Sequence, residues 1–268
     1  MSAHRHSPIG AIALLSALAL PAHALPLLDE NFDDVPLGTV QSALANAPAS
    51  LPAGTLWSSS GNTNPVNLRS GTDAINTCNA GNPNQRFSFA AGTTFFNPNT
   101  ASKHFLVLGD DSGQLAGTPY NGTFALALPF VLPDCALALT VGFDWVFKAF
   151  TIFSTDPAFI STDRFAVGIA GQGFDITNPF AGMTNLLLDQ SLTLAGGLRG
   201  PANATVPVSA LGAANAAGQH YLVFGLLENL PTTAQSTNGA AGIDKVMITV
   251  ELSGPGAFAL RALEVPAL

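Results

Sequence analysis

The amino-acid sequence predicts an all-β protein, a two-sheet antiparallel β-sandwich of the jelly-roll type. Large apolar side chains occupy every second position of one long run, with mostly small residues between them: Leu137, Leu139, Val141, Phe143, Trp145 and Phe147. Side chains of a strand point alternately to its two faces, so this period predicts a core strand. No stretch carries the apolar stripe of a long amphipathic helix. Parallel βαβ architecture is therefore disfavoured, and an antiparallel sandwich is favoured.

The amino-terminal residues have the pattern of a secretory signal peptide. An apolar run from Ala11 to Leu20 follows Arg5 and ends before the small-x-small triplet Ala22-His23-Ala24. This order of basic, apolar and small residues predicts export, with cleavage after Ala24. We therefore expect residues 1–24 to be a leader that is absent from the mature, secreted protein.

Strand-like runs then follow one another along a single expected domain, residues 25–253, with residues 254–268 as a carboxy-terminal tail. Turn-rich segments full of Gly, Asn, Pro and Ser separate the runs. The expected strands are Arg86–Ala91, Phe105–Gly109, Thr123–Val131, Ala136–Phe147, Arg164–Ala170, Leu186–Leu194, His220–Leu227 and Lys245–Leu252. Several of them repeat the alternation of large and small side chains that marks the longest run.

Charge and cysteine content narrow the class of protein. The formal net charge is −8 and only 10% of residues are charged, so the chain lacks the basic surface of a nucleic-acid-binding protein. After the leader no stretch reaches about 18 uninterrupted apolar residues, so we expect no membrane span in the mature chain. Cys78 and Cys135 are the only cysteines, and an even pair in an exported protein predicts a disulfide between them.

Catalytic patterns are weak. The segment Gly109-Asp110-Asp111-Ser112-Gly113 is similar to the nucleophile loop of a serine protease, but an extra Asp interrupts it, and a turn is the better interpretation. Glycoside hydrolysis requires two carboxylates in one cleft. Asp144, close to Lys148 in the sequence, is the only catalytic candidate placed on a strand, and a paired structural role is favoured for it. We therefore expect no catalytic residues and no enzyme activity.

A metal site is the more credible chemistry. Asp29-Glu30-Asn31-Phe32-Asp33-Asp34 opens the mature chain, and Asp244 opens the last expected strand. If the first and last strands are neighbours, Asp33, Asp244 and Glu30 form a candidate set of oxygen ligands for a structural calcium ion. The alternative is that these acids only solvate a terminal strand and that Asp244 closes a turn.

Two segments carry a resemblance to a known group. Phe143-Asp144-Trp145-Val146-Phe147, followed by Asp163-Arg164-Phe165-Ala166-Val167, resembles exported bacterial β-sandwich proteins that often end in a Pro-Glu-Pro sorting tail. This chain ends in Glu264-Val265-Pro266-Ala267-Leu268 without such a tail. The resemblance implies a surface or matrix protein. More distantly, the acids of the first and last strands resemble those of carbohydrate-binding jelly rolls with a structural calcium, where Asp33 and Asp244 match the two acids.

Three functions follow as hypotheses. The first is a non-catalytic exported β-sandwich that binds or assembles at the cell surface or in the extracellular matrix. The second is a lectin-like carbohydrate-binding module, for which Trp57, Tyr120 and Tyr221 are the Trp and Tyr residues outside the expected core strand. The third is a polysaccharide-active enzyme. The possible partners are a glycan or a surface or matrix component.

Overall fold

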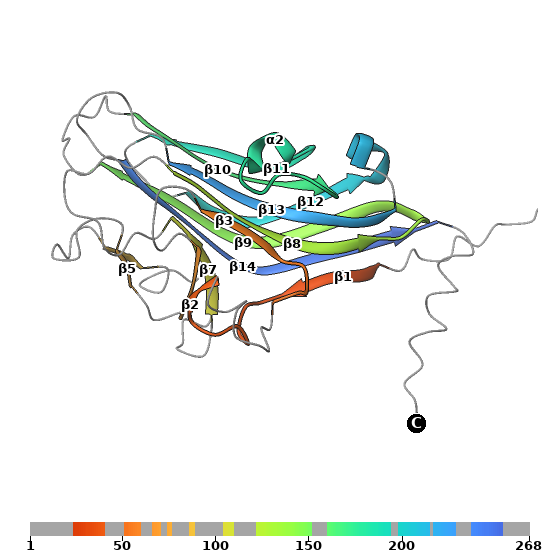
Figure 1. The fold of residues 1–268 in the computed structure, drawn as a ribbon, viewed down its shortest axis with the longest axis horizontal. Coiled ribbons are helices and arrows are strands. Elements are labelled where there is room, and N and C mark those ends of the chain that lie inside the picture. Colours follow the sequence, from red (N-terminus) through yellow and green to blue (C-terminus); the bar gives the residue numbers. More distant parts are fainter. Residues whose placement is uncertain are drawn as a thin grey trace, which may run out of the picture.

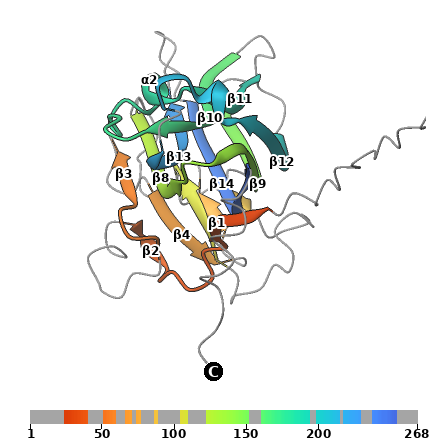
Figure 2. The same ribbon diagram turned by 90° about the vertical axis from the view of Figure 1, so that its right-hand side faces the viewer.

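The computed structural model describes residues 24–40, 51–59, 66–70, 74–76, 86–88, 104–109, 122–151, 160–193, 198–214, 217–228 and 237–253. Within them two antiparallel sheets pack face to face as a β-sandwich (Figures 1 and 2). The predicted fold class is therefore confirmed.

The larger sheet has seven strands in the described residues. They are arranged β12-β9-β14-β7-β4-β2, and β1 also pairs with β14. Their bounds are β1 Leu25–Glu30, β2 Gly38–Thr39, β4 Val66–Ser70, β7 His104–Leu108, β9 Ala136–Thr151, β12 Leu198–Pro207 and β14 Thr237–Leu252. The central pair β9 and β14, each 16 residues long, runs antiparallel from Thr237 opposite Thr151 to Leu252 opposite Ala136.

The smaller sheet has five strands in the order β11-β10-β13-β8-β3. Their bounds are β3 Leu56–Ser59, β8 Gly122–Leu132, β10 Ile160–Gly171, β11 Asn185–Thr193 and β13 Gly218–Glu228. A separate two-stranded sheet joins β5 Ala74–Asn76 to β6 Arg86–Ser88, and two short helical turns, α2 Pro179–Gly182 and η2 Val208–Ala214, complete the described elements. Every strand predicted from the sequence is present, with shifted ends.

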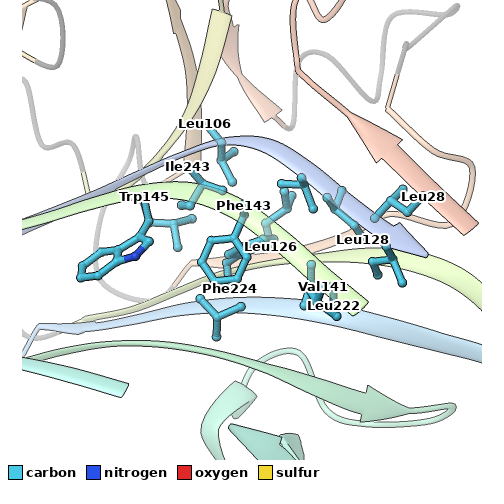
Figure 3. Close-up of a cluster of buried hydrophobic side chains, with 14 of the residues drawn as sticks. Leu28, Leu106, Leu126, Leu128, Val141, Phe143, Trp145, Leu222, Phe224 and Ile243 are labelled. Atoms are coloured by element: carbon cyan, nitrogen blue, oxygen red, sulfur yellow. The ribbon is translucent and has the colours of Figure 1, made fainter. Parts of the chain in front are cut away.

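The core lies between the two sheets, where their inward side chains meet (Figure 3). Phe143 and Trp145 of β9 are 3% and 6% exposed, so the prediction that both are buried is confirmed. The Phe143 ring meets Phe224 of β13 edge to face at 5.5 Å between centroids. Contacts of this kind across the two layers hold the sheets at a fixed separation.

One position of the diagnostic alternation was interpreted wrongly. Leu137 is 49% exposed, whereas the following alternate residues from Leu139 to Phe147 are buried. The pairing of β9 with β14 shifts register between Glu251 and Leu252, beside this end of β9. Alternation alone predicts the face of a side chain but not whether the opposing layer extends far enough to cover it.

Candidate functional site

The first and last strands are neighbours, as the acid pattern predicted. β1 pairs antiparallel with β14, and Glu30 lies opposite Val246. On β14, Asp244 lies opposite Asp144 of β9, and Met247 opposite Gly142, so β14 has a bulge at Lys245 and Val246. An extra residue on one strand bends it locally and redirects the neighbouring side chains.

At the bulge, Lys245 contacts two acids, Asp244 and Asp144. Lys245 has a left-handed backbone with a φ of 51°. Its N–H donates to Oδ1 of Asp244 at 2.7 Å, and its Nζ donates to Oδ2 of Asp144 at 2.7 Å. Asp144 is therefore paired as expected, and the partner that the structure shows is Lys245, which is far away in sequence.

The turn that follows β1 uses its acids to bind backbone N–H groups. Oε1 of Glu30 accepts from the N–H of Phe32 at 2.7 Å, and Phe32 has a left-handed φ of 58°. Oδ1 of Asp33 accepts from the N–H of His104 at 3.0 Å, where β7 begins. The His104 ring bonds back to the carbonyl of Val35 through Nδ1 at 2.8 Å, which requires the proton on Nδ1.

The pKa of each of the two buried acids in this region is raised. Burial raises the pKa of Asp244 to about 7, although its bond to the N–H of Lys245 and the charge of Lys245 oppose the shift. The nearby charges of Asp33 and Asp144 add to the increase. The pKa of Glu30 is also raised, chiefly by burial and further by the charges of Asp29, Asp34 and Asp33. Removing water from a carboxylate without a full counter-charge favours protonation.

The strand pairing and the hydrogen bonds show where the three predicted metal ligands lie. Asp33 lies near both other acids, but Glu30 is on the side of β1 that also carries Leu28, and Asp244 is on the opposite side of the sheet. In the described part of the chain, no three His, Cys, Asp or Glu side chains gather closely enough to hold a metal ion. Calcium binding by Asp33, Asp244 and Glu30 therefore stays a prediction, and each of these acids has a structural hydrogen bond.

The predicted disulfide falls partly outside the described residues. Cys135 is half-buried in the turn before β9, and its carbonyl accepts from the N–H of Ser253 at 2.8 Å. Cys78 lies outside the residues that the structure describes. The pairing of the two cysteines therefore stays a prediction. Of the interrupted Gly109–Gly113 loop, the structure describes Gly109, whose φ of 80° agrees with the turn interpretation.

The outer face of the smaller sheet is covered by the chain itself. The connection between β10 and β11, residues 172–184 and called the flap below, lies over β10 and β13 (Figure 1). Its side chains Phe174, Ile176 and Met183 pack on a floor of Ala127, Ala170, Tyr221 and Val223. A Cβ at Gly168 would lie 2.6 Å from the carbonyl oxygen of Asn185, and one at Gly225 would lie 3.2 Å from the Phe180 ring. The flap therefore needs these two glycines beneath it.

The outer face of the larger sheet differs along its width. We call the part formed by β12, β9, β14 and β1 the open face. Thr205, Thr140 and Thr249 lie side by side across three strands in one row, and the hydroxyls of Thr140 and Thr205 are 3.3 Å apart. The next row contains Asn203, Gly142, Met247 and Asp29, of which only Gly142 is half-buried and the others are exposed. No aromatic residue lies in these two rows.

Of the candidate sugar-stacking residues, Tyr221 is not placed for that role. Tyr221 is 8% exposed, and its hydroxyl accepts from Nε2 of Gln219 at 2.8 Å under the flap, where the Phe174 ring packs against it at a tilt. Trp57 is half-buried against the main core. Tyr120 lies outside the described residues. Sequence reasoning missed the open face, because a single exposed threonine has no signal until neighbouring strands align several of them.

No helix of the described chain is long and apolar enough to cross a membrane. No protein family and no curated protein matches the chain in sequence. Its structure is similar to the K1 cleaved adhesin domain of Lys-gingipain from Porphyromonas gingivalis, with 12% identity, a TM-score of 0.39, and coverage of 85% of this chain and 98% of that domain.

Two carbohydrate-binding modules are also similar. One is the mannan-recognising module TmCBM27, with 10% identity, a TM-score of 0.32, and coverage of 86% of this chain and 99% of that module. The other is CBM27-1 of Caldicellulosiruptor saccharolyticus, solved in complex with mannohexaose, with 14% identity, a TM-score of 0.33, and coverage of 83% and 96%. Likeness of this degree does not extend to a ligand or an activity.

Proposed function

We propose that this chain is a non-catalytic exported β-sandwich protein that acts in binding or assembly at the cell surface or in the extracellular matrix. The contrast between the two outer faces carries the proposal. The flap covers the smaller sheet, whereas the open face of the larger sheet presents exposed polar side chains on a rigid surface. Export rests on the leader-like residues 1–24.

The open face suits an extended partner with regularly spaced polar groups. Neighbouring strands lie about 4.8 Å apart, so the positions of Thr205, Thr140 and Thr249 repeat at about that spacing across the sheet, although the hydroxyls of Thr140 and Thr205 approach each other to 3.3 Å. Each hydroxyl both donates and accepts a hydrogen bond. The exposed thioether of Met247, 46% exposed, adds an apolar contact beside this row.

The acids at the bulge support a structural role over a catalytic one. Asp144 is held by Lys245, and Glu30, Asp33 and Asp244 each bind a backbone N–H. Hydrolysis of a glycoside needs one acid free to donate a proton and one free carboxylate in a common cleft. These hydrogen bonds instead stabilise the bulge and the turn after β1.

A glycan is the second candidate partner, in a lectin-like role with a structural calcium at Asp33, Asp244 and Glu30. The observation that favours it is the combination of hydroxyl and amide side chains on the open face, since these groups hydrogen-bond sugar hydroxyls. Such binding would rely on hydrogen bonds more than on aromatic stacking, because the two rows of the open face named above contain no aromatic residue.

A binding screen tests the proposal. The mature protein is applied to a glycan array and to extracellular matrix from producing cells, with turnover assays on every glycan that binds. In the variant Thr140→Ala/Thr205→Ala/Thr249→Ala, we expect binding to fall at least tenfold with little change in melting temperature. The control Gln172→Ala changes an exposed residue in the turn that begins the flap and should bind normally. Binding that survives the triple variant contradicts the open face, and glycan turnover contradicts the non-catalytic role.

A further inference from the structure

The edge strands of this sandwich differ in how they are protected. Within the described residues, three strands of six or more residues pair on one side only: β1, β12 and β11. A strand edge offers unpaired N–H and C=O groups to any other strand, and natural proteins block such edges with proline or charge. Two of these edges carry such blocks, and the third does not.

Prolines protect β12 and β1. Pro201 and Pro207 of β12 differ by an even number of positions, so both lack an N–H on the same side of the strand, and proline is tolerated in an edge strand where that side faces away from the sheet. Pro26 lies beside a register shift in β1, which also carries the acids Asp29 and Glu30. Proline, charge and irregular pairing of this kind protect an edge against a further strand.

The edge of β11 is not protected by proline or by an unpaired charge. Its sequence, Asn-Leu-Leu-Leu-Asp-Gln-Ser-Leu-Thr, contains no proline and no basic residue. Its single charge, on Asp189, is bound by Nε and Nη2 of Arg164 at 2.7 Å each, so the edge is locally close to neutral. Leu186 is 49% exposed at one end of the strand.

We propose that two copies of this chain associate through β11, paired antiparallel about a two-fold axis at Gln190. A two-fold axis makes the same edge serve as both partners, which is the commonest symmetry of homo-oligomers. The chain as a whole carries a net charge of −8, so two copies repel each other in general. A second copy can approach at the edge of β11 because this edge is locally close to neutral.

Two neighbouring registers are disfavoured, one by charge and one by the strand pairing. An axis at Asp189 would place two carboxylates opposite each other, and like charges in that position destabilise a sheet. An axis at Leu187 falls where the pairing of β10 with β11 shifts register, between Val167 and Gly168. An axis at Gln190 uses the regular part of the strand and places Asp189 of each copy opposite Ser191 of the other, a pair that can hydrogen-bond.

Strand addition of this kind buries a small area, so we expect weak association that depends on concentration. Analytical ultracentrifugation of the mature protein over a concentration series measures it. Gln190→Lys and Gln190→Glu each place like charges at the axis, and each variant alone should have a dissociation constant at least tenfold higher than the wild type. An equimolar mixture of the two variants should associate again, because lysine then faces glutamate.

The control substitutions are Gln172→Lys and Gln172→Glu, at an exposed residue in the turn after β10, which should leave association unchanged. Melting temperatures show whether each variant is folded. A wild-type protein that stays monomeric at its highest soluble concentration overturns the proposal. Association that persists in both Gln190 variants, or a mixture that fails to associate again, overturns it as well.

Discussion

Replacing Asp244 with asparagine should stabilise the protein at neutral pH. The side chain is 7% exposed, and burial raises its pKa from 3.8 to about 7. Asparagine has nearly the same shape and keeps an oxygen that can accept from the N–H of Lys245. It therefore mimics the protonated carboxyl that the folded state prefers.

The sign of the pH dependence follows from where the proton is bound. Between pH 4 and 7 the folded state keeps a proton on Asp244 that the unfolded chain releases. Stability therefore falls as pH rises through this window, and it levels off above the folded pKa. Each unit of pKa shift corresponds to about 1.4 kcal/mol, so a shift of roughly three units sets an upper limit of about 4 kcal/mol on the cost of ionised Asp244. Glu30, whose pKa is also raised, contributes in the same direction.

The assay is thermal unfolding of the wild type and Asp244→Asn from pH 4 to 8. For a domain of this size we expect the melting temperature of the variant to exceed that of the wild type by about 5 °C at pH 8, with the difference vanishing near pH 4. The matched control is Asp144→Asn, which removes the half-exposed ion pair with Lys245 and should change the unfolding free energy by about 1 kcal/mol or less. A lower melting temperature for Asp244→Asn at pH 8 would refute the reasoning and show that ionised Asp244 is stabilising.

Four further predictions test other parts of the molecule. Trp145→Ala should reduce the unfolding free energy by about 3 to 5 kcal/mol in denaturant titrations, because Trp145 is 6% exposed in the core; a loss below about 1 kcal/mol would contradict its burial there. Gly168→Val should displace the flap, because a Cβ there meets Asn185 and Met183, so proteolysis within residues 172–184 should become faster, whereas exposed Gln172→Ala should leave it unchanged. Mass spectrometry without reductant should find a peptide linked through Cys78 and Cys135, and free thiols in protein from an oxidising compartment would exclude the disulfide. If calcium binds at Asp33, Asp244 and Glu30, calcium should raise the melting temperature by several degrees relative to chelator, and Asp244→Ala should abolish the effect; identical melts would leave only the hydrogen-bonding role of these acids.

Local pattern was enough to predict the sandwich. In β9 and β14 the alternation of large and small residues is visible within a few positions, and side chains such as Val246 and Ile248 are buried as that period requires. The proximity of the first and last strands was also predictable, since acids are rare in this chain and two groups of them had to be placed. Each of these features depends on side chains that are close together in the sequence or unusual in composition.

β12 and the arrangement of the acids were not predictable in the same way. β12 has the sequence Leu-Arg-Gly-Pro-Ala-Asn-Ala-Thr-Val-Pro, which has no strong period, and it is a strand because β9 supplies its hydrogen-bond partners. The sequence by itself determined that large and small side chains alternate along the strands, that the chain is acidic and that it is rich in strands. Only the tertiary structure decided that Lys245 pairs with Asp144, that Glu30 and Asp244 lie on different sides of a sheet, and that Leu137 is exposed, because these outcomes depend on the register between strands that are far apart in the chain.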